Sequence, residues 1–199
     1  KKSIKGLTII NGYKFSYLGR SAEKTLKKFS SDFLSQNKFE ARIFSIGKII
    51  YNKNNNFENL IDVAKIYLNT PFILPKFDKE TINNNMYSLY SNRIFLNSLS
   101  EKSPFYLYHY YNFLRQIFKF YASYLGYEHY LDSKIERILT DKLYQKIYKW
   151  EEFPDKKFIK IWLICLEERN PKSIEKIYNY LEKKIIKIEE HKFKMSWVE

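Results

Sequence analysis

Two short, mainly apolar runs lie near the start of the chain, on either side of a polar dipeptide. Residues 7–10 read Leu-Thr-Ile-Ile, residues 13–17 read Tyr-Lys-Phe-Ser-Tyr, and Asn11-Gly12 separates them. Runs rich in β-branched and aromatic residues are typical of strands. Asn-Gly accepts positive φ angles at both positions of a tight turn. The pattern therefore predicts a β-hairpin.

After the hairpin, the apolar positions take up helical spacing. Leu26, Phe29 and Phe33 lie on one face of a helix expected over residues 21–36, and Ser21 stands at its start. A serine in this position satisfies a free backbone N–H of the first turn.

A second pair of strands is expected next. Residues 41–44 and 48–51 are short apolar runs, and Ile46-Gly47 offers a turn between them. The Asn-rich residues 53–56 predict a polar loop.

From Phe57 onward the apolar spacing is helical throughout. It predicts a helix over residues 57–68, a connector broken by Pro71 and Pro75, and then a series of helices that ends near His191. The start signals of these later helices are Asp78, Ser103-Pro104, Asp132, Asp141, Pro154-Asp155 and Asn170-Pro171. Short links between several helices indicate a bundle.

The expected fold is thus α+β and mainly α. A small partial antiparallel sheet with one or two helices precedes a five- to six-helix bundle. We expect residues 1–55 to form the first unit, residues 56–77 a connecting helix and linker, and residues 78–199 the bundle.

Composition narrows the class of protein. Apolar residues make up 45% of the chain and aromatic residues 19%, which is more than a disordered chain contains. Cys165, the single cysteine, lies in the apolar run IWLICL, which favours a buried thiol and a reducing compartment. No run approaches the roughly 18 apolar residues of a membrane span. We therefore expect a cytoplasmic protein with no membrane partner.

The net charge of +13 suggests an anionic partner. Clustered Lys and Arg bind phosphates by releasing counterions, so nucleic acid or a nucleotide is one candidate. The same charge also fits an origin without a partner. The chain is rich in residues with A/T-rich codons, so genomic bias contributes to the charge, and dispersed charge also favours solubility.

The helix expected after Ser103 has an unusual composition. Aromatic residues cover most of its circumference, which indicates either a buried central helix or a platform on which bases stack. One polar stripe interrupts the rings at steps of three and four residues, and it either faces solvent or lines a cleft. The binding candidates are this stripe with Arg115 at its margin and Arg93 on the preceding helix, namely Arg93, His109, Asn112, Arg115, Gln116, Lys119 and Ser123.

Catalytic and metal-binding motifs are missing from the sequence. His109, His129 and His191 lie too far apart for the usual ligand spacing, and there is no zinc finger, P-loop or dinucleotide fingerprint. Neither Arg93 nor Arg115 has the histidine four to six residues on that a helical RNase of the HEPN class would show. We predict no catalytic residue and no metal ligand.

Several stretches together resemble a known family. The segment EARIFSIGKIIYNKNNNFENLIDVAKIYLNTPF, with its Gly-Lys-Ile-Ile-Tyr phrase, resembles the end of the palm in minimal nucleotidyltransferases. The stretches MYSLYSNRIFLNSL, YLYHYYNFLRQIFKFYASYLG and KIERILTDKLYQKIYKWEEFPDKKFIKIWLICLEER look like the HEPN-like helical domain that follows it. The resemblance covers about residues 5–170. It implies that residues 1–55 are part of a palm and that the bundle docks a substrate.

The chain departs from this family where the chemistry should be. Family members use a Gly-Ser motif followed by Asp-x-Asp, whose carboxylates hold magnesium ions, and neither is present. The nearest pair, Asp78 and Glu80, falls in the connector. Either the catalytic half precedes Lys1 or it has been lost, so ATP and Mg²⁺ are expected only with an upstream half or a partner.

Two functions follow as hypotheses. One is a nucleotidyltransferase-like protein that supplies part of the palm and a docking bundle for an anionic partner, without catalysis by this chain alone. The alternative is a non-enzymatic subunit of a defence or toxin–antitoxin type assembly, which binds nucleic acid, a partner protein or a second copy of itself.

Overall fold

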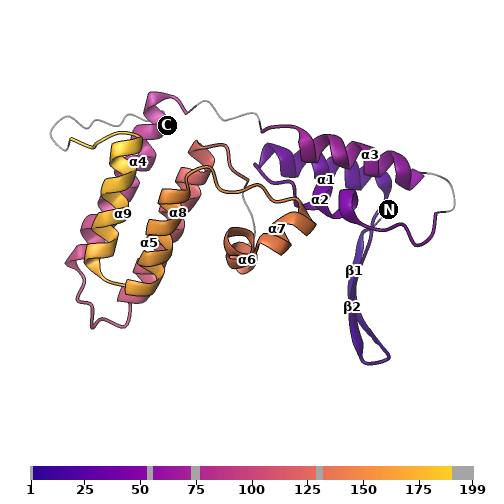
Figure 1. The fold of residues 1–199 in the computed structure, drawn as a ribbon, viewed down its shortest axis with the longest axis horizontal. Coiled ribbons are helices and arrows are strands. Elements are labelled where there is room, and N and C mark those ends of the chain that lie inside the picture. Colours follow the sequence, from indigo (N-terminus) through magenta and orange to yellow (C-terminus); the bar gives the residue numbers. More distant parts are fainter. Residues whose placement is uncertain (1, 53–55, 73–76, 129–131, 190–199) are drawn as a thin grey trace.

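The computed structural model describes residues 2–52, 56–72, 77–128 and 132–189, and it has the expected α+β, mainly α fold (Figure 1). A hairpin of β1 (Ile4–Ile10) and β2 (Tyr13–Gly19) precedes α1 (Ala22–Leu34), α2 (Phe39–Ile46) and α3 (Asn56–Asn69). The remaining elements are α4 (Lys79–Ser98), α5 (Tyr106–Tyr124), the 3-10 turn η1 (Asp132–Lys134), α6 (Ile135–Thr140), α7 (Lys142–Tyr148), α8 (Lys156–Glu168) and α9 (Pro171–Lys184).

The predicted hairpin is confirmed, and its strands are longer than expected. Asn11 and Gly12 adopt φ angles of 51° and 80°, as a two-residue turn between twisted strands requires. The antiparallel register pairs Ile10 with Tyr13 next to the turn and Ile4 with Gly19 at the open end. The hairpin projects from the helices, which leaves nearly all of its side chains exposed (Figure 1).

The first three helices pack together as a small unit. Ser21 begins α1 as predicted, because its side chain accepts a hydrogen bond from the backbone N–H of Lys24. Phe29, Ala41 and Ala64 form the buried centre. Leu26, expected on the same face as Phe29, is 39% exposed.

The prediction of a second strand pair was wrong. Residues 39–46 form α2, and residues 47–52 have no regular structure. Helical spacing places Ala41 in the centre of the unit, and three residues later Phe44 meets Phe29 edge-on at 5.4 Å between ring centroids. Packing against α1 and α3 has thus overridden the strand preference of this apolar segment.

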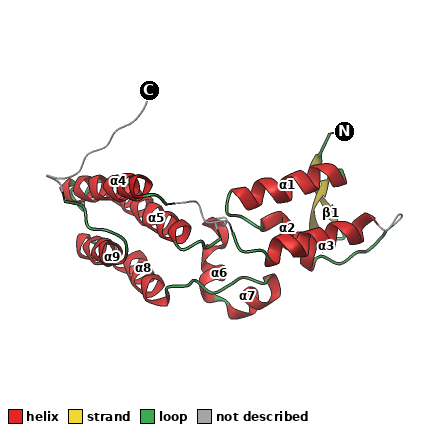
Figure 2. Ribbon diagram, turned by 90° about the horizontal axis from the view of Figure 1, so that it is seen from above, coloured by secondary structure: helices red, strands yellow, loops and turns green. Residues whose placement is uncertain are grey.

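Helices α4, α5, α8 and α9 form the bundle, with α6 and α7 between it and the first unit (Figure 2). The side chains of Asp78, Asp141, Asp155 and Asn170 each accept a hydrogen bond from a backbone N–H in the first turn of the helix that follows, which confirms these start signals. The prediction at Ser103-Pro104 was early, since this dipeptide lies in a turn before α5.

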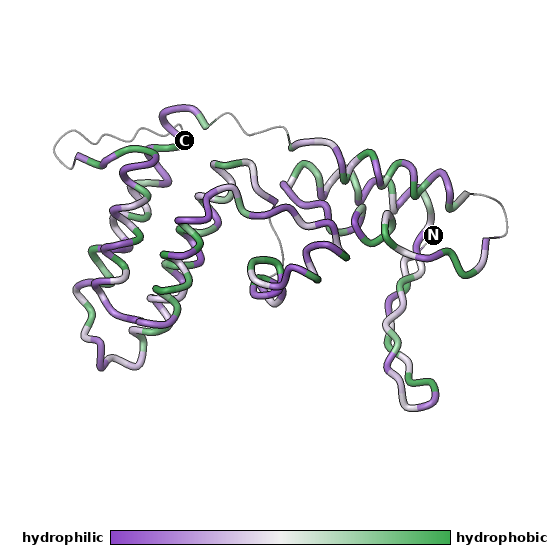
Figure 3. The backbone as a smooth tube through the Cα atoms, in the orientation of Figure 1, coloured by the Kyte–Doolittle hydropathy of each residue, from purple (hydrophilic) through white to green (hydrophobic). Residues whose placement is uncertain are grey.

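Helix α5 is the buried centre of the bundle. Tyr110, Phe113 and Ile117 are almost completely buried, so the aromatic residues of this helix serve mainly as core. The core reaches α8 through two hydrogen bonds, from the Tyr110 hydroxyl to the Cys165 carbonyl at 2.6 Å and from Trp162 Nε1 to the Leu114 carbonyl at 3.0 Å. Apolar segments alternate with polar ones along all four helices (Figure 3). Among the described helices, none is both long and apolar enough to cross a membrane.

Candidate functional site

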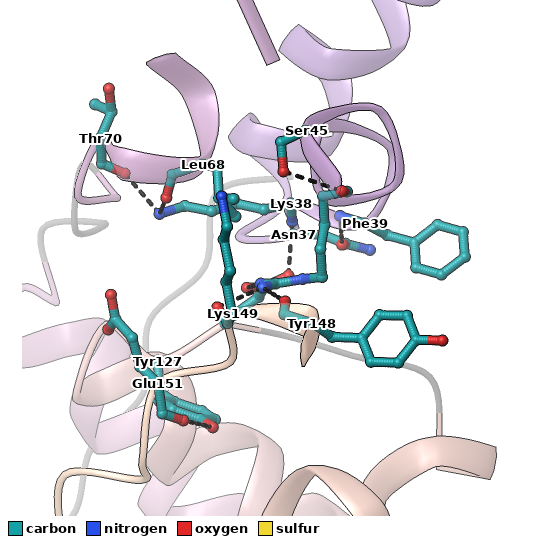
Figure 4. A network of polar contacts seen from close by, with 12 residues as sticks. Asn37, Lys38, Phe39, Ser45, Leu68, Thr70, Tyr127, Tyr148, Lys149 and Glu151 are labelled. Atoms are coloured by element: carbon teal, nitrogen blue, oxygen red, sulfur yellow. Dashed lines mark hydrogen bonds and ion pairs between the residues drawn. The ribbon is translucent and has the colours of Figure 1, made fainter. Parts of the chain in front are cut away.

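Three charged residues, Lys38, Arg42 and Glu128, meet in the interior where α2 approaches the bundle. Figure 4 shows the network around Lys38 from close by. The Lys38 backbone N–H donates to Glu128 Oε1 at 2.9 Å, and Arg42 pairs with the other carboxylate oxygen. Arg42 also donates to the carbonyls of Tyr148 and Lys149 at 2.5 and 2.6 Å. The exposed fractions are 8% for Lys38, 4% for Arg42 and 8% for Glu128. This junction network therefore connects α2, the end of α5 and the end of α7 in a water-poor setting.

The Lys38 side chain ties the same junction to α3. Its ammonium group donates to the carbonyls of Leu68 at 2.9 Å and Thr70 at 2.7 Å, and it lies 4.6 Å from the centre of the Phe72 ring. These carbonyls lie at the end of α3, where backbone oxygens lack helical partners and a cation is favoured.

Burial is the largest influence on the pKa values of the three charged groups in the junction network. Loss of water raises the pKa of Glu128, and the positive charge of Arg42 opposes that rise. The same loss lowers the pKa values of Lys38 and Arg42. The Arg42 guanidinium stacks on Trp150 at 3.8 Å from the ring centre, which compensates part of the lost hydration.

A junction cavity of about 320 Å³ lies beside this network. Lys38, Arg42, Glu128 and Trp150 line it. The two cations already donate to carbonyls or to Glu128, so they offer an incoming anion few unused hydrogen bonds. We therefore interpret the junction network as a joint between the two units.

A second cavity, of about 270 Å³, lies within the bundle between α5, α8 and the segment that starts α6. Its surface is mainly apolar and includes the rings of three aromatic side chains. The residues that line this bundle cavity are Tyr111, Leu114, Arg115, Phe118, Lys119, Ala122, Glu128, Asp132, Ile135, Trp162 and Leu166.

The cationic side of the bundle cavity comes from two adjacent turns of α5. Arg115 forms an ion pair with Asp132 at 2.7 Å, and each side chain is 55% exposed. Lys119 is exposed and forms no ion pair with a described residue. An exposed ion pair contributes at most about 1 kcal/mol, so a stronger anion can replace Asp132 at Arg115. The apolar walls and the two cations at the rim make the bundle cavity a better candidate for a ligand site than the junction cavity.

The predicted binding residues separate into groups. Only Arg115 and Lys119 of the predicted set line the bundle cavity. On the α4 side of α5, His109 packs edge-on against Phe95 at 5.0 Å, and Gln116 accepts a hydrogen bond from Asn92 at 2.7 Å.

The other three predicted residues lie elsewhere. Asn112 is half-buried, and the hydroxyl of Ser123 donates to Gln36 Oε1 at 2.5 Å. Arg93 forms an ion pair with Glu175 at 3.0 Å and lies over the ring of Tyr178 at 4.3 Å, so it joins α4 to α9. The single stripe predicted on α5 is therefore divided among several contacts.

Sequence reasoning missed the residues that complete the two cavities. Trp162 and Phe118 read as ordinary core positions, and Asp132 read as a helix cap. Lys38, Arg42 and Glu128 gave no local signal, because Glu128 lies 90 and 86 positions away along the chain from its two partners.

Over the described parts of the chain, no three His, Cys, Asp or Glu side chains gather in a way that could hold a metal ion. No protein-family model, curated protein or solved structure matches the chain.

Proposed function

We propose that this chain is a binding protein for an anionic ligand with a planar ring, a nucleotide or a base of single-stranded nucleic acid, and that the ring enters the bundle cavity. The observation that carries the proposal is one apolar, aromatic cavity bordered by two cationic side chains, Arg115 and Lys119.

The size and chemistry of the cavity support this ligand class. A volume of about 270 Å³ is near the lower end for small-molecule pockets, so it suits a ring and leaves the sugar and phosphate at the rim. Trp162, Phe118 and Tyr111 provide ring surfaces, and base–aromatic contacts contribute about 1–3 kcal/mol per base. Arg115 and Lys119 would meet the phosphate, as charge-assisted hydrogen bonds favour.

The resemblance to minimal nucleotidyltransferases suggests a role for such binding in a transfer reaction. The bundle would then be the docking domain for an anionic substrate, and the transfer chemistry would need the Asp-x-Asp carboxylates of an upstream half or a partner, with ATP and Mg²⁺. The chain described here would bind without transferring. The alternative role, a non-enzymatic subunit that binds nucleic acid, makes use of the same cavity.

The test measures nucleotide and oligonucleotide binding by titration calorimetry and by tryptophan fluorescence. We expect ATP and a short single-stranded oligonucleotide to bind and to quench Trp162. Lys119→Ala and Arg115→Ala should each weaken binding by about tenfold, because each removes a charge-assisted contact to phosphate. In a Trp162→Phe variant this quenching should disappear, which would assign it to the bundle cavity.

Lys102→Ala is the matched control, since Lys102 is exposed in the turn before α5 and does not line the cavity. Unchanged affinity in Lys119→Ala would show that binding does not use this cavity. An equal loss in Lys102→Ala and Lys119→Ala would show that binding depends on overall charge and not on this site. Labelled ATP with Mg²⁺ and candidate acceptors, added to the same samples, should give no transferred label.

A further inference from the structure

We propose that two copies of the chain associate through one face of the β1–β2 hairpin. The register places alternate residues of both strands on the same side, because successive side chains of a strand point to opposite faces. We define the aromatic face by its residues, Ile4, Gly6, Thr8, Ile10, Tyr13, Phe15, Tyr17 and Gly19. The opposite face consists of Lys5, Leu7, Ile9, Lys14, Ser16 and Leu18.

The aromatic face lies open, because none of the described helices packs against the hairpin (Figure 1). The exposed fractions are 73% for Tyr13, 48% for Phe15 and 51% for Tyr17, with Ile4 and Ile10 above one half as well. A two-stranded hairpin is marginally stable on its own in water. A contiguous apolar surface of this kind is typical of an interaction site.

The aromatic face is also flat where Tyr17 lies over Gly6. The Tyr17 ring lies directly over Gly6, where the Cβ of any other residue would come within 2.3 Å of the ring. Glycine therefore lets the phenol lie across β1, and the pair fills what would otherwise be a gap in the face.

Charge limits where a second copy can dock. Each copy carries a net charge of +13, which opposes self-association, so a contact between two copies is least opposed where positive charge is absent. The aromatic face has no charged side chain, since Lys5 and Lys14 both belong to the opposite face. Nucleic acid would need cations beside the rings to neutralise phosphates, and this face has none. A face that is uncharged and apolar complements itself in a two-fold dimer.

The available area sets the expected affinity. Five large side chains about half exposed amount to roughly 500 Å² per copy. Two copies would then bury roughly 1,000 Å², the lower limit for a specific interface, so we expect a dissociation constant in the roughly micromolar range.

Sedimentation velocity of the full chain over a concentration series tests the proposal. The 24.3 kDa chain should sediment as a monomer when dilute and as a dimer of twice that mass when concentrated. Phe15→Lys should weaken the dimer at least about tenfold, because it places a charge in the apolar contact. Ser16→Lys adds the same charge to the same strand on the opposite face and should leave the dimer intact.

Phe15→Thr separates loss of contact from loss of the hairpin, since threonine retains strand preference, and it too should weaken the dimer. High salt should leave association unchanged or strengthen it, because the contact is uncharged. A wild-type chain that stays monomeric throughout the series overturns the proposal, as would occur if the face serves a different protein. Equal effects of Phe15→Lys and Ser16→Lys also overturn it.

Discussion

Cys165 lies in the middle of α8 with no exposed surface, and its thiol donates to the Ser173 carbonyl at 3.2 Å. Burial raises the pKa of this thiol to about 12, because the charged thiolate is disfavoured away from water. The apolar run IWLICL was sufficient to predict this position, since a thiol among such residues usually behaves as a small core side chain. Residues whose environment is set by their near neighbours were predictable in this way.

Cys165 should resist thiol reagents while the chain is folded. At pH 8 the thiol is neutral and enclosed, so we expect labelling to be slower than that of a free thiol by several orders of magnitude. Labelling followed by mass spectrometry, with a urea series alongside, checks this. The rate should rise with the unfolded fraction, and rapid labelling of the native protein would contradict the buried position.

Lys38 and Arg42 show where residue-level prediction stops. Charged residues are almost never fully buried unless they are paired, and their pairing partner Glu128 is distant in the sequence. The candidate cavity has the same origin, since its two cations come from α5, its carboxylates Glu128 and Asp132 from after α5 and from η1, and its Trp162 from α8. Sequence periodicity placed Arg115 and Lys119 near each other, but it contained no information on what would face them.

At the scale of elements, most helices were predictable because their start signals are local. Asp155 begins α8 by accepting a hydrogen bond from the Phe158 N–H, and it also accepts from the hydroxyls of Tyr121 and Tyr180 at 2.7 and 2.8 Å. Helix α2 was the exception, because its apolar residues resemble a strand and only packing on α1 and α3 decides for a helix. A helix cap depends on residues within one turn of each other. The choice between helix and strand for α2 depends on packing against α1 and α3.

The Asp155 cap should make stability depend on pH at the acidic end. Burial opposes ionisation of Asp155, but the hydrogen bonds from Phe158, Tyr121 and Tyr180 outweigh it and hold its pKa below 3.8. A lowered pKa gives stability that is present above the unfolded value and is lost as the pH falls through the folded value. Tyr180→Phe should therefore lower the free energy of unfolding by about 1–2 kcal/mol at pH 7, and by less as the pH falls far enough to protonate Asp155.

Urea unfolding of both proteins across this pH range provides the measurement. Tyr124→Phe is a suitable comparison, because Tyr124 is a half-buried ring of the same bundle that packs against Phe77 and Phe120. That variant should change stability little, and without the acid dependence. A Tyr180→Phe effect that stays constant with pH would mean that the Asp155 contact is not the cause.

At the scale of the whole molecule, the junction network connects the two units, together with the hydrogen bond from Ser123 to Gln36. The fold class followed from the sequence, and so did the order of elements apart from α2. The way in which the first unit meets the bundle did not, since no pattern in either unit points to the other. Glu128 lies just after α5, and Arg42 on α2 reaches it together with the carbonyls at the end of α7. One buried ion pair thus joins three segments.

Breaking that ion pair should destabilise the molecule strongly. Arg42→Met leaves the Glu128 carboxylate buried without its partner, and we expect a loss of about 3–5 kcal/mol. Adding Glu128→Gln removes the stranded charge while keeping an acceptor for the Lys38 N–H, so the double variant should recover part of that loss. Chemical denaturation of the two single variants and the double variant gives the coupling energy.

Lys65→Met offers a reference, because it breaks the exposed Lys65–Asp62 pair on α3 and should change stability by less than about 1 kcal/mol. If Arg42→Met were as mild as this surface change, the junction network would not hold the units together.

Glu128 contributes to the walls of both the bundle cavity and the junction cavity. A ligand that displaces this carboxylate from one side must also disturb Arg42 on the other side, and through Arg42 the position of α2. The coupling is then equal in both directions. A contact that stabilises the docked position of α2 changes the affinity of the bundle cavity for its ligand by a certain factor, and a bound ligand changes the docking equilibrium of α2 by the same factor. Through the shared Glu128 side chain, ligand binding in the bundle is coupled to the docking of the first unit.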